Sequence, residues 1–146
     1  MGTLLNLVDH VAVNVTDMEK SLKFYHEVLG LKIIFQTERS GSDLDRALNA
    51  PGAKLRYSYL QADNTCIGLI QYVNPAGKSY DRKTCDTGIM HLAFRVPDIE
   101  KAYAQLKEKG VRFNSSPVKI ESGPQKGSVF AFFTDPDGIT LEIFQE

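Results

Sequence analysis

The chain has 146 residues, of which 42% are hydrophobic, so it is long and apolar enough to build a packed core. Its 17 basic and 18 acidic residues leave a formal charge of −1, which argues against nucleic acid or an anionic membrane as a partner and favours a small-molecule substrate. The first residues lack the apolar segment of a signal peptide, and the only cysteines are Cys66 and Cys85. We therefore expect a cytoplasmic protein.

An internal repeat organises the sequence. The segment VDHVAVNVTDMEKSLKFYHEVLGLKI (8–33) is parallel to IMHLAFRVPDIEKAYAQLKEKGVRF (89–113), which places His91 81 residues after His10. Each copy opens with apolar residues at every second position, the pattern of a half-buried strand. Apolar residues at helical spacing follow, so each copy predicts a strand and then an amphipathic helix.

The ends of both helices carry recognisable signals. Asp17 or Thr16 is expected to cap the first helix, and Asp98 is expected to cap the second. Gly30 and Gly110 can adopt the left-handed conformation that commonly ends a helix. These glycines are 80 residues apart rather than 81, so the second helix segment is one residue shorter.

The remaining segments repeat as well. YSYLQADNTCIGLIQ (57–71) is parallel to AFFTDPDGITLEIFQ (131–145), and each contains an Asp-Asn or Asp-Gly turn signal between apolar runs. Two polar regions, 34–54 and 114–128, are expected to form a short strand and a loop, and the part 38–54 could cover a site. The element order predicts an α+β fold: a single domain, 1–146, of two tandem βαβββ modules, about residues 5–75 and 87–146. We expect these modules to form a cup-shaped mixed sheet with helices on the outside.

The turn signals also predict a strand register. If both turns are two-residue hairpin loops, Gly68 pairs with Tyr59 and Glu142 pairs with Phe133.

Three potential metal ligands fall on the sheet face that points away from the helices. His10 and His91 occupy equivalent positions of the two copies, on the opposite face from the apolar residues that pack on the helices. Glu142 lies on a strand whose other face is wholly apolar. Two imidazoles and one carboxylate can form a divalent-metal site with open coordination positions. The third histidine, His26, is expected to be solvated.

On these residues the sequence resembles the vicinal oxygen chelate superfamily, which includes glyoxalase I, methylmalonyl-CoA epimerase, fosfomycin-resistance enzymes, extradiol dioxygenases and bleomycin-resistance proteins. The segments that carry the resemblance are DHVAVNVTDMEKSLKFYHEVLGLK, GIMHLAFRVPDIEKAYAQLKEKG and FFTDPDGITLEIFQ. The resemblance implies a homodimer and one divalent metal ion (Zn, Ni, Co, Mn or Fe), held by His10, His91 and Glu142 and chelated by substrate oxygens. It does not define the reaction, because one scaffold hosts many chemistries.

One position departs from the superfamily members that have four protein ligands. The repeat spacing of 74 makes residue 68 equivalent to Glu142, and residue 68 is glycine, whereas glyoxalase I-like and epimerase-like members have Glu or Gln there. Gln71 is three residues further along and faces the other side of the strand. The site is therefore either built from three protein ligands or no longer binds metal. A glutathione lyase is disfavoured, because the obvious proton-shuttling carboxylate is missing.

Two classes with three ligands fit less well. Extradiol dioxygenases share the ending PDGITLE (136–142), but their required histidine and tyrosine would fall near 124–126 and at 132, where the chain has Pro-Gln-Lys and Phe. No clear match to the phosphonate-binding residues of fosfomycin-resistance enzymes is found. Both classes are weaker alternatives.

We predict a metal-dependent enzyme that performs lyase or isomerase/epimerase chemistry at a metal-chelated carbonyl of a small oxygenated substrate. Tyr59, Arg95, Tyr72 and Asn14 are candidate substrate-binding residues, because strand parity places them on the ligand face. No residue is assigned as the general base. The alternative is a metal-free binding protein of the bleomycin-resistance type, and the site could lie within one chain or across the dimer.

Overall fold

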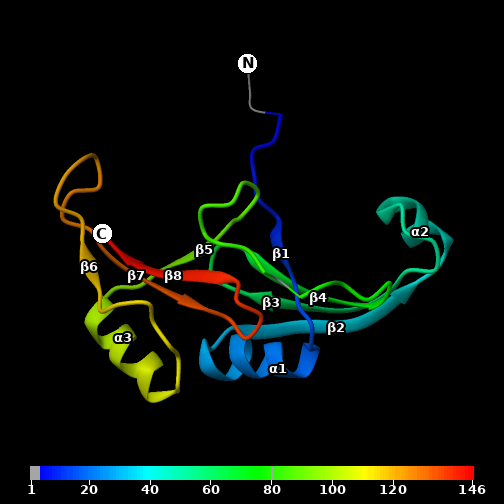
Figure 1. Cartoon of the computed structure of the whole chain (residues 1–146), viewed down its shortest axis with the longest axis horizontal. Coiled ribbons are helices and arrows are strands. Elements are labelled where there is room, and N and C mark those ends of the chain that lie inside the picture. The colour runs from blue at the N-terminus through cyan, green and yellow to red at the C-terminus, as the bar shows by residue number, and fades with distance from the viewer. Residues whose placement is uncertain (1–3, 80) are drawn as a thin grey trace. The chain divides into compact units, whose positions relative to one another are not determined.

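The computed structural model describes residues 4–79 and 81–146, and the chain divides into two compact units, Met1–Ser79 and Tyr80–Glu146. Each unit is a four-stranded mixed sheet with the connectivity βαβββ, which confirms the predicted α+β class and the two tandem modules (Figure 1). In the part of the chain that the structure describes, no helix is long and apolar enough to cross a membrane.

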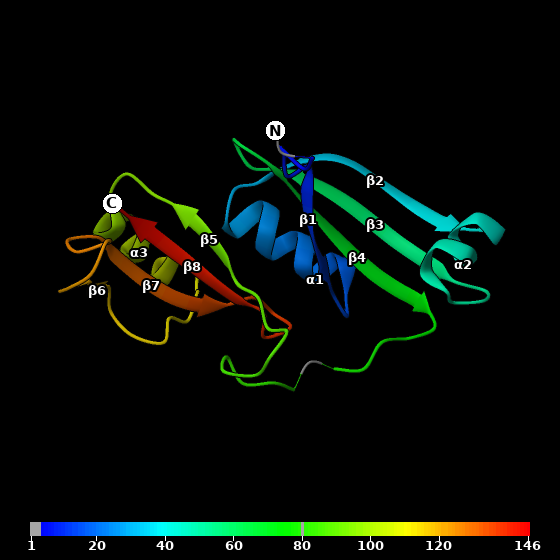
Figure 2. The same cartoon turned by 90° about the horizontal axis from the view of Figure 1, so that it is seen from above.

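The first unit orders its strands as β1-β4-β3-β2, with β1 and β4 parallel and the other pairs antiparallel (Figure 2). Its elements are β1 (His10–Asn14), α1 (Met18–Leu22), the π-helical stretch η1 (Lys23–Val28), β2 (Lys32–Ser40), α2 (Ser42–Leu48), β3 (Lys54–Gln61) and β4 (Cys66–Asn74).

The second unit repeats this arrangement with the order β5-β8-β7-β6, in which β5 and β8 are parallel. Its elements are β5 (Leu92–Arg95), α3 (Ile99–Glu108), β6 (Val118–Lys119), β7 (Val129–Thr134) and β8 (Thr140–Gln145). The second strand of this unit, β6, contains only two residues, whereas its equivalent in the first unit, β2, contains nine.

The core of each unit lies between the sheet and the helix that follows its first strand. In the first unit, Leu60 and Leu69 are fully buried on the sheet and Tyr25 on the helical segment. In the second unit, Leu141 and Phe133 are fully buried. The alternation of buried and exposed residues along β1 follows the predicted parity, because Val13 is buried whereas His10, Ala12 and Asn14 are exposed. Burial of one face thus sets which side chains the other face presents.

Both helices begin as predicted from the repeat. The carboxylates of Asp17 and Asp98 accept hydrogen bonds from the backbone N–H groups of the residues three positions later, at 3.1 and 3.0 Å. The last strand of each unit adds a second cap: the Gln71 Oε1 accepts from the Met18 N–H at 3.2 Å, and the Gln145 Oε1 accepts from the Ile99 N–H at 2.7 Å. These glutamines are repeat-equivalent and face the helices, as strand parity predicts for position 71.

The extra residue of the first helix segment is accommodated by a π-helical turn. The Leu29 N–H donates to the Phe24 carbonyl at 2.9 Å, a bond that spans five residues instead of four. Gly30 and Gly110 nevertheless end both segments in the same way, with φ angles of +83° and +88°. The one-residue difference in repeat spacing is therefore absorbed inside η1, before the chain enters β2.

The predicted register is confirmed in one hairpin and wrong in the other. Gly68 pairs with Tyr59 across the tight turn between β3 and β4, as expected. Glu142 pairs with Phe132 rather than with Phe133, because the second turn is longer. Asp135 organises this turn: its Oδ1 accepts backbone N–H bonds from Asp137 at 2.9 Å and from Ile139 at 2.8 Å.

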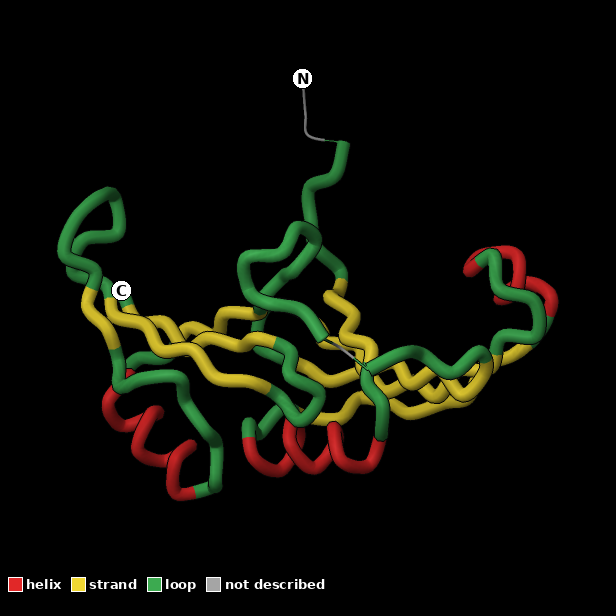
Figure 3. The backbone as a smooth tube through the Cα atoms, viewed as in Figure 1, coloured by secondary structure: helices red, strands yellow, loops and turns green. Residues whose placement is uncertain are grey.

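The region 38–54 is not the polar loop that we expected. It completes β2 and then forms α2, which lies on the opposite side of the first sheet from α1 (Figures 1 and 3). Leu44 of α2 is buried with Ala53 and Leu55, and Ile70 and Tyr72 of β4 pack against this cluster. Leu44, Ala47 and Leu48 are the only apolar residues of α2, and this short pattern is too weak a periodic signal to predict the helix.

Candidate functional site

The second unit brings together two of the three predicted metal ligands. Glu142 lies on β8 between the buried Leu141 and Ile143 and projects from the opposite face of the strand. His91 immediately precedes β5, and its Nε2 lies 3.1 Å from the Glu142 Oε2. The carboxylate residue is 8% exposed, whereas the imidazole is 50% exposed. A buried acid thus shares the sheet face with a half-exposed base.

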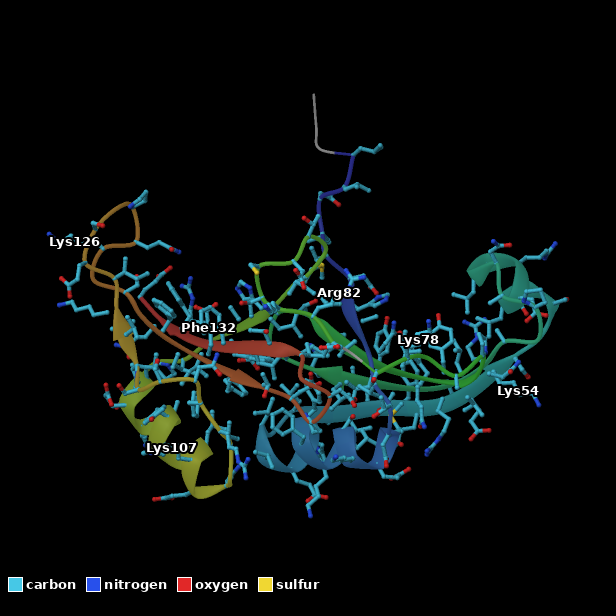
Figure 4. The ribbon with its side chains drawn as sticks, viewed as in Figure 1. Lys54, Lys78, Arg82, Lys107, Lys126 and Phe132 are labelled. Atoms are coloured by element: carbon cyan, nitrogen blue, oxygen red, sulfur yellow. The ribbon has the colours of Figure 1, made fainter. Side chains whose placement is uncertain are left out.

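An aromatic ring supports this pair from one side. The ring of Phe132, which pairs with Glu142 across the sheet, meets the His91 ring edge to face at a centroid distance of 5.5 Å. Phe130 in turn contacts Phe132 at 5.4 Å. Phe132 is labelled in Figure 4 on the sheet of the second unit, on the side away from α3.

The first unit places His10 in an equivalent setting. Its ring lies 5.1 Å from that of Tyr59, and its Nδ1 is 2.7 Å from the Asp9 Oδ2. A carboxylate on Nδ1 fixes the tautomer and leaves Nε2 for a metal or a ligand. The imidazole is 38% exposed. We call the sheet surfaces that carry His10 in the first unit and His91 in the second the site faces.

The two site faces match residue by residue. Ala12 pairs with Gly68, and Gly68 pairs with Tyr59. In the second unit Ala93 pairs with Glu142, and Glu142 pairs with Phe132. Gly68 is therefore the structural equivalent of Glu142, as the repeat spacing predicted.

Tyrosine side chains occupy the space that Gly68 leaves. A Cβ atom at Gly68 would lie 3.0 Å from the Tyr57 hydroxyl and 3.3 Å from ring atoms of Tyr57 and Tyr59. The two tyrosine rings are 5.0 Å apart, and Phe35 of β2 stacks on Tyr59 at 5.0 Å. Burial, followed by a hydrogen bond with Tyr59, raises the pKa of Tyr57 well above that of a free tyrosine. The Tyr57 phenol therefore keeps its proton far into the alkaline range.

The predicted substrate-binding residues fall into different surroundings. Tyr59 and Asn14 lie on the site face of the first unit, together with His10. Tyr72 is also on this face but packs against the cluster beneath α2. Arg95 is exposed on the second unit, and its guanidinium lies 2.5 Å from a carboxylate oxygen of Glu146. Of the four residues, only Tyr59 is shown in contact with a predicted metal ligand.

The donor chemistry of the second unit fits a divalent ion in part. The His91 Nε2 and the Glu142 Oε2 form a direct ion pair at 3.1 Å. With metal–ligand bonds of about 2.1 Å, two ligands at right angles are roughly 3 Å apart, so the same distance is also compatible with one shared ion. Within either unit, for the residues described, no three His, Cys, Asp or Glu side chains gather around one point. His91 and Glu142 alone are thus two donors, fewer than a stable divalent-metal site needs.

Two sets of residues near the site are not among the predicted site residues. Tyr57 is two residues before Tyr59 and so shares its face of β3, but its contact with position 68 depends on side-chain rotamers, which a sequence pattern does not encode. The capping glutamines, Gln71 and Gln145, carried a signal in their repeat spacing of 74. They connect the last strand of each unit to the start of its helix.

Comparison with known proteins agrees with this architecture. The model of the Glyoxalase/Bleomycin resistance protein/Dioxygenase superfamily matches residues 7–143, so the chain belongs to this superfamily. A crystal structure of a glyoxalase family protein from Bacillus cereus has the same fold, with a TM-score of 0.84 over 99% of this chain and 96% of the other at 18% identity.

Several relatives have similar sequences. The uncharacterized protein YwkD of Bacillus subtilis is 33% identical over 98% of this chain and 99% of its own length. A 2-epi-5-epi-valiolone epimerase of Actinomyces sp is 29% identical, with 93% of this chain and 77% of the relative covered. A lactoylglutathione lyase of Arabidopsis thaliana is 30% identical over 93% of this chain, which spans 43% of that protein. The superfamily is thus established, and its members include a lyase and an epimerase.

Proposed function

We propose that this protein is a metal-dependent enzyme that acts on a small oxygenated substrate by lyase or isomerase/epimerase chemistry at a carbonyl group. One divalent ion would be held by His91 and Glu142, with His10 supplied by the first unit of the same chain or of a second chain in a dimer. The observation that carries the proposal is the 3.1 Å approach of the His91 Nε2 to the Glu142 carboxylate on one sheet face.

Burial of Glu142 supports this assignment. Removing a carboxylate from water is unfavourable unless a cation or hydrogen-bond donors compensate its charge. Glu142 is 8% exposed, and low exposure strengthens its attraction for a cation. When bound, a divalent ion supplies Lewis-acid chemistry that polarises a substrate carbonyl.

The surroundings of the ligands define the part that the chain itself plays. Asp9 orients the His10 ring by its contact with Nδ1, and Phe132 packs against the His91 ring. The aromatic residues Tyr57, Tyr59 and Phe35 line the site face of the first unit and would bind the carbon skeleton of a small substrate. The similarity to a lyase and an epimerase supports the reaction class, and we further propose that the enzyme works in the cytoplasm as a homodimer.

The test is metal content after purification and after reconstitution with Zn, Ni, Co, Mn or Fe salts. We expect about one equivalent of ion per chain in the wild type and loss of at least 90% of it in His91→Ala and Glu142→Ala, because each removes a ligand. His26→Ala is the matched control, since His26 is exposed and its Nδ1 contacts the Leu31 carbonyl oxygen at 2.7 Å. Wild-type protein that remains metal-free after reconstitution would refute the proposal.

A second candidate function is metal-free binding of a flat aromatic compound, as in bleomycin-resistance proteins. The observation that favours it is the row of stacked rings formed by Phe35 and Tyr59, which lie at an interplanar angle of 15°. Binding of an aromatic ligand that is equally tight with and without chelator, and that persists in Glu142→Ala but not in Tyr59→Ala, would support this function over the enzyme.

A further inference from the structure

We propose that the site face of the second unit binds a small organic carboxylate with an apolar body, in which Arg95 holds the carboxylate and three phenylalanines contact the body. The inference rests on the proposed function in one respect, because it names a substrate class for the same enzyme. Its evidence comes only from residues of the second unit, and the binding that it describes requires no metal ion.

The apolar part of this surface consists of three phenylalanines. Phe130 and Phe132 occupy alternate positions of β7, and their rings lie 5.4 Å apart, edge to face. Phe144 of β8 pairs with Phe130 and lies two residues after Glu142, so it shares the face of that carboxylate. Each of the three residues is only partly buried. We call Phe130, Phe132 and Phe144 the phenylalanine cluster, which leaves apolar surface exposed for a ligand.

One cation lies beside the cluster. Arg95 pairs with Phe144 across the sheet and therefore shares its face. The Arg95 Nη2 donates to the Glu146 Oε1 at 2.5 Å, and the two side chains are 68% and 65% exposed. An ion pair so open to water contributes little to stability, so a ligand carboxylate can replace Glu146 at little cost. The planar guanidinium can hold that carboxylate with two parallel N–H donors.

The order of the strands gives a bound ligand its direction. Arg95, Phe144 and Phe130 are successive partners on β5, β8 and β7. Neighbouring strands lie about 4.8 Å apart, so two such spacings carry the row roughly 10 Å across the sheet. A carboxylate on Arg95 would therefore place its apolar body over the cluster. This span suits an arylalkanoic acid of the size of 3-phenylpropionate.

The surroundings of Arg95 also favour an acid over a polyhydroxylated ligand. Phenylalanine side chains offer no hydrogen bonds, so hydroxyl groups placed on the cluster would lose those that they make with water. The Glu142 carboxylate of the same face is paired with the His91 imidazole at 3.1 Å. A ligand on Arg95 thus has only the exposed Glu146 carboxylate to displace, and that side chain can turn into water.

The first test titrates 3-phenylpropionate into the chelator-treated full chain and follows binding by NMR chemical shifts. Arg95→Gln should weaken binding at least about fivefold, because the hydrogen bonds to a charged group are lost. The neutral analogue 3-phenylpropanamide should bind this variant and the wild type equally. Lys107→Gln is the matched control, since the Lys107 Nζ lies over the Tyr103 ring on α3, and it should bind the acid as the wild type does.

Two further variants test the arrangement from the other sides. Glu146→Gln should bind the acid about twofold or more tightly, because it removes the carboxylate that competes for Arg95. Phe130→Ala should weaken the binding of acid and amide alike by about threefold or more, because apolar contact is lost. Since Arg95 and Glu146 are both exposed, their variants should melt at the wild-type temperature.

The outcomes separate this inference from the proposed function. A wild type that does not bind the acid, or an Arg95→Gln variant with unchanged affinity for it, overturns the inference but not the proposed metal site. Weaker binding in Glu146→Gln also contradicts it, because the two carboxylates would then not compete. A wild type that cannot be loaded with metal but binds the acid through Arg95 refutes the proposed function and supports the binding site.

Discussion

Replacing Asp135 by alanine should destabilise the second unit. The Asp135 side chain is 5% exposed, and its Oδ1 accepts the backbone N–H groups of Asp137 and Ile139 at 2.9 and 2.8 Å. Hydrogen bonds to a charged group contribute at least about 1.5 kcal/mol each, so losing both should reduce the free energy of unfolding by about 3 kcal/mol. Asp135→Asn keeps an amide oxygen as acceptor and should lose about half as much.

The assay is urea unfolding followed by circular dichroism, with the unfolding midpoint compared at a common slope. Asp63→Ala in the equivalent turn of the first unit is the matched control, because Asp63 is exposed. Asp135→Ala should also weaken metal binding, since this turn determines that Glu142 pairs with Phe132. If Asp135→Ala destabilises the protein no more than Asp63→Ala does, the carboxylate does not organise the turn and the argument is refuted.

Three further predictions concern the caps, the tyrosine and the metal. Gln145→Ala should lower the free energy of unfolding by about 1 kcal/mol in urea titrations, because the Ile99 N–H loses its acceptor. An unchanged urea midpoint would show that Gln145 does not stabilise the start of α3. The raised pKa of Tyr57 means that folding favours the neutral phenol, so its contribution to the free energy of unfolding is complete below about pH 10 and is lost as the pH rises towards the folded-state pKa. Between pH 9 and pH 11 Tyr57→Phe should therefore lose less unfolding free energy than the wild type. Equal losses in the two proteins would argue against a raised pKa at Tyr57. A chelator should lower the melting temperature of the metal-loaded wild type but not that of His91→Ala, because a ligand that binds only the folded state stabilises it; equal shifts would indicate that His91 is not a ligand.

The repeat predicted most of the fold because the same physical constraints act twice. Strand parity, helix caps and terminal glycines recur in both copies, so each copy supported the interpretation of the other. Asp17 and Asp98 cap their helices as expected, and Gly30 and Gly110 end them. Local signals of this kind suffice because each depends only on residues nearby in the sequence.

The errors arose where side chains override the backbone pattern. The Asp-Gly pair at 137–138 suggested a two-residue turn, but Asp135 captures two N–H groups and stabilises a longer one. This one-residue change moved the partner of Glu142 from Phe133 to Phe132, and Phe133 lies fully buried instead. A register prediction fails completely when a turn is misjudged by one residue.

The sequence predicted which residues form the candidate site, but not the distances between their side chains. The sequence placed His91 and Glu142 on one face, and the structure brings them within 3.1 Å of each other. Their role as metal ligands, and that of His10, stays a prediction. The sequence also located the departure at Gly68, but it could not indicate that Tyr57 lies against that glycine.

Strand β8 is anchored at both of its ends. Asp135 closes the turn that leads into it, and Gln145 binds the first turn of α3 at its far end. Glu142 lies between these two anchors, so the backbone that carries it is fixed when the second unit folds. A ligand that binds at this strand would therefore require little reorganisation of the backbone. The conformational entropy of the β8 backbone is lost when the second unit folds, and not when the ligand binds.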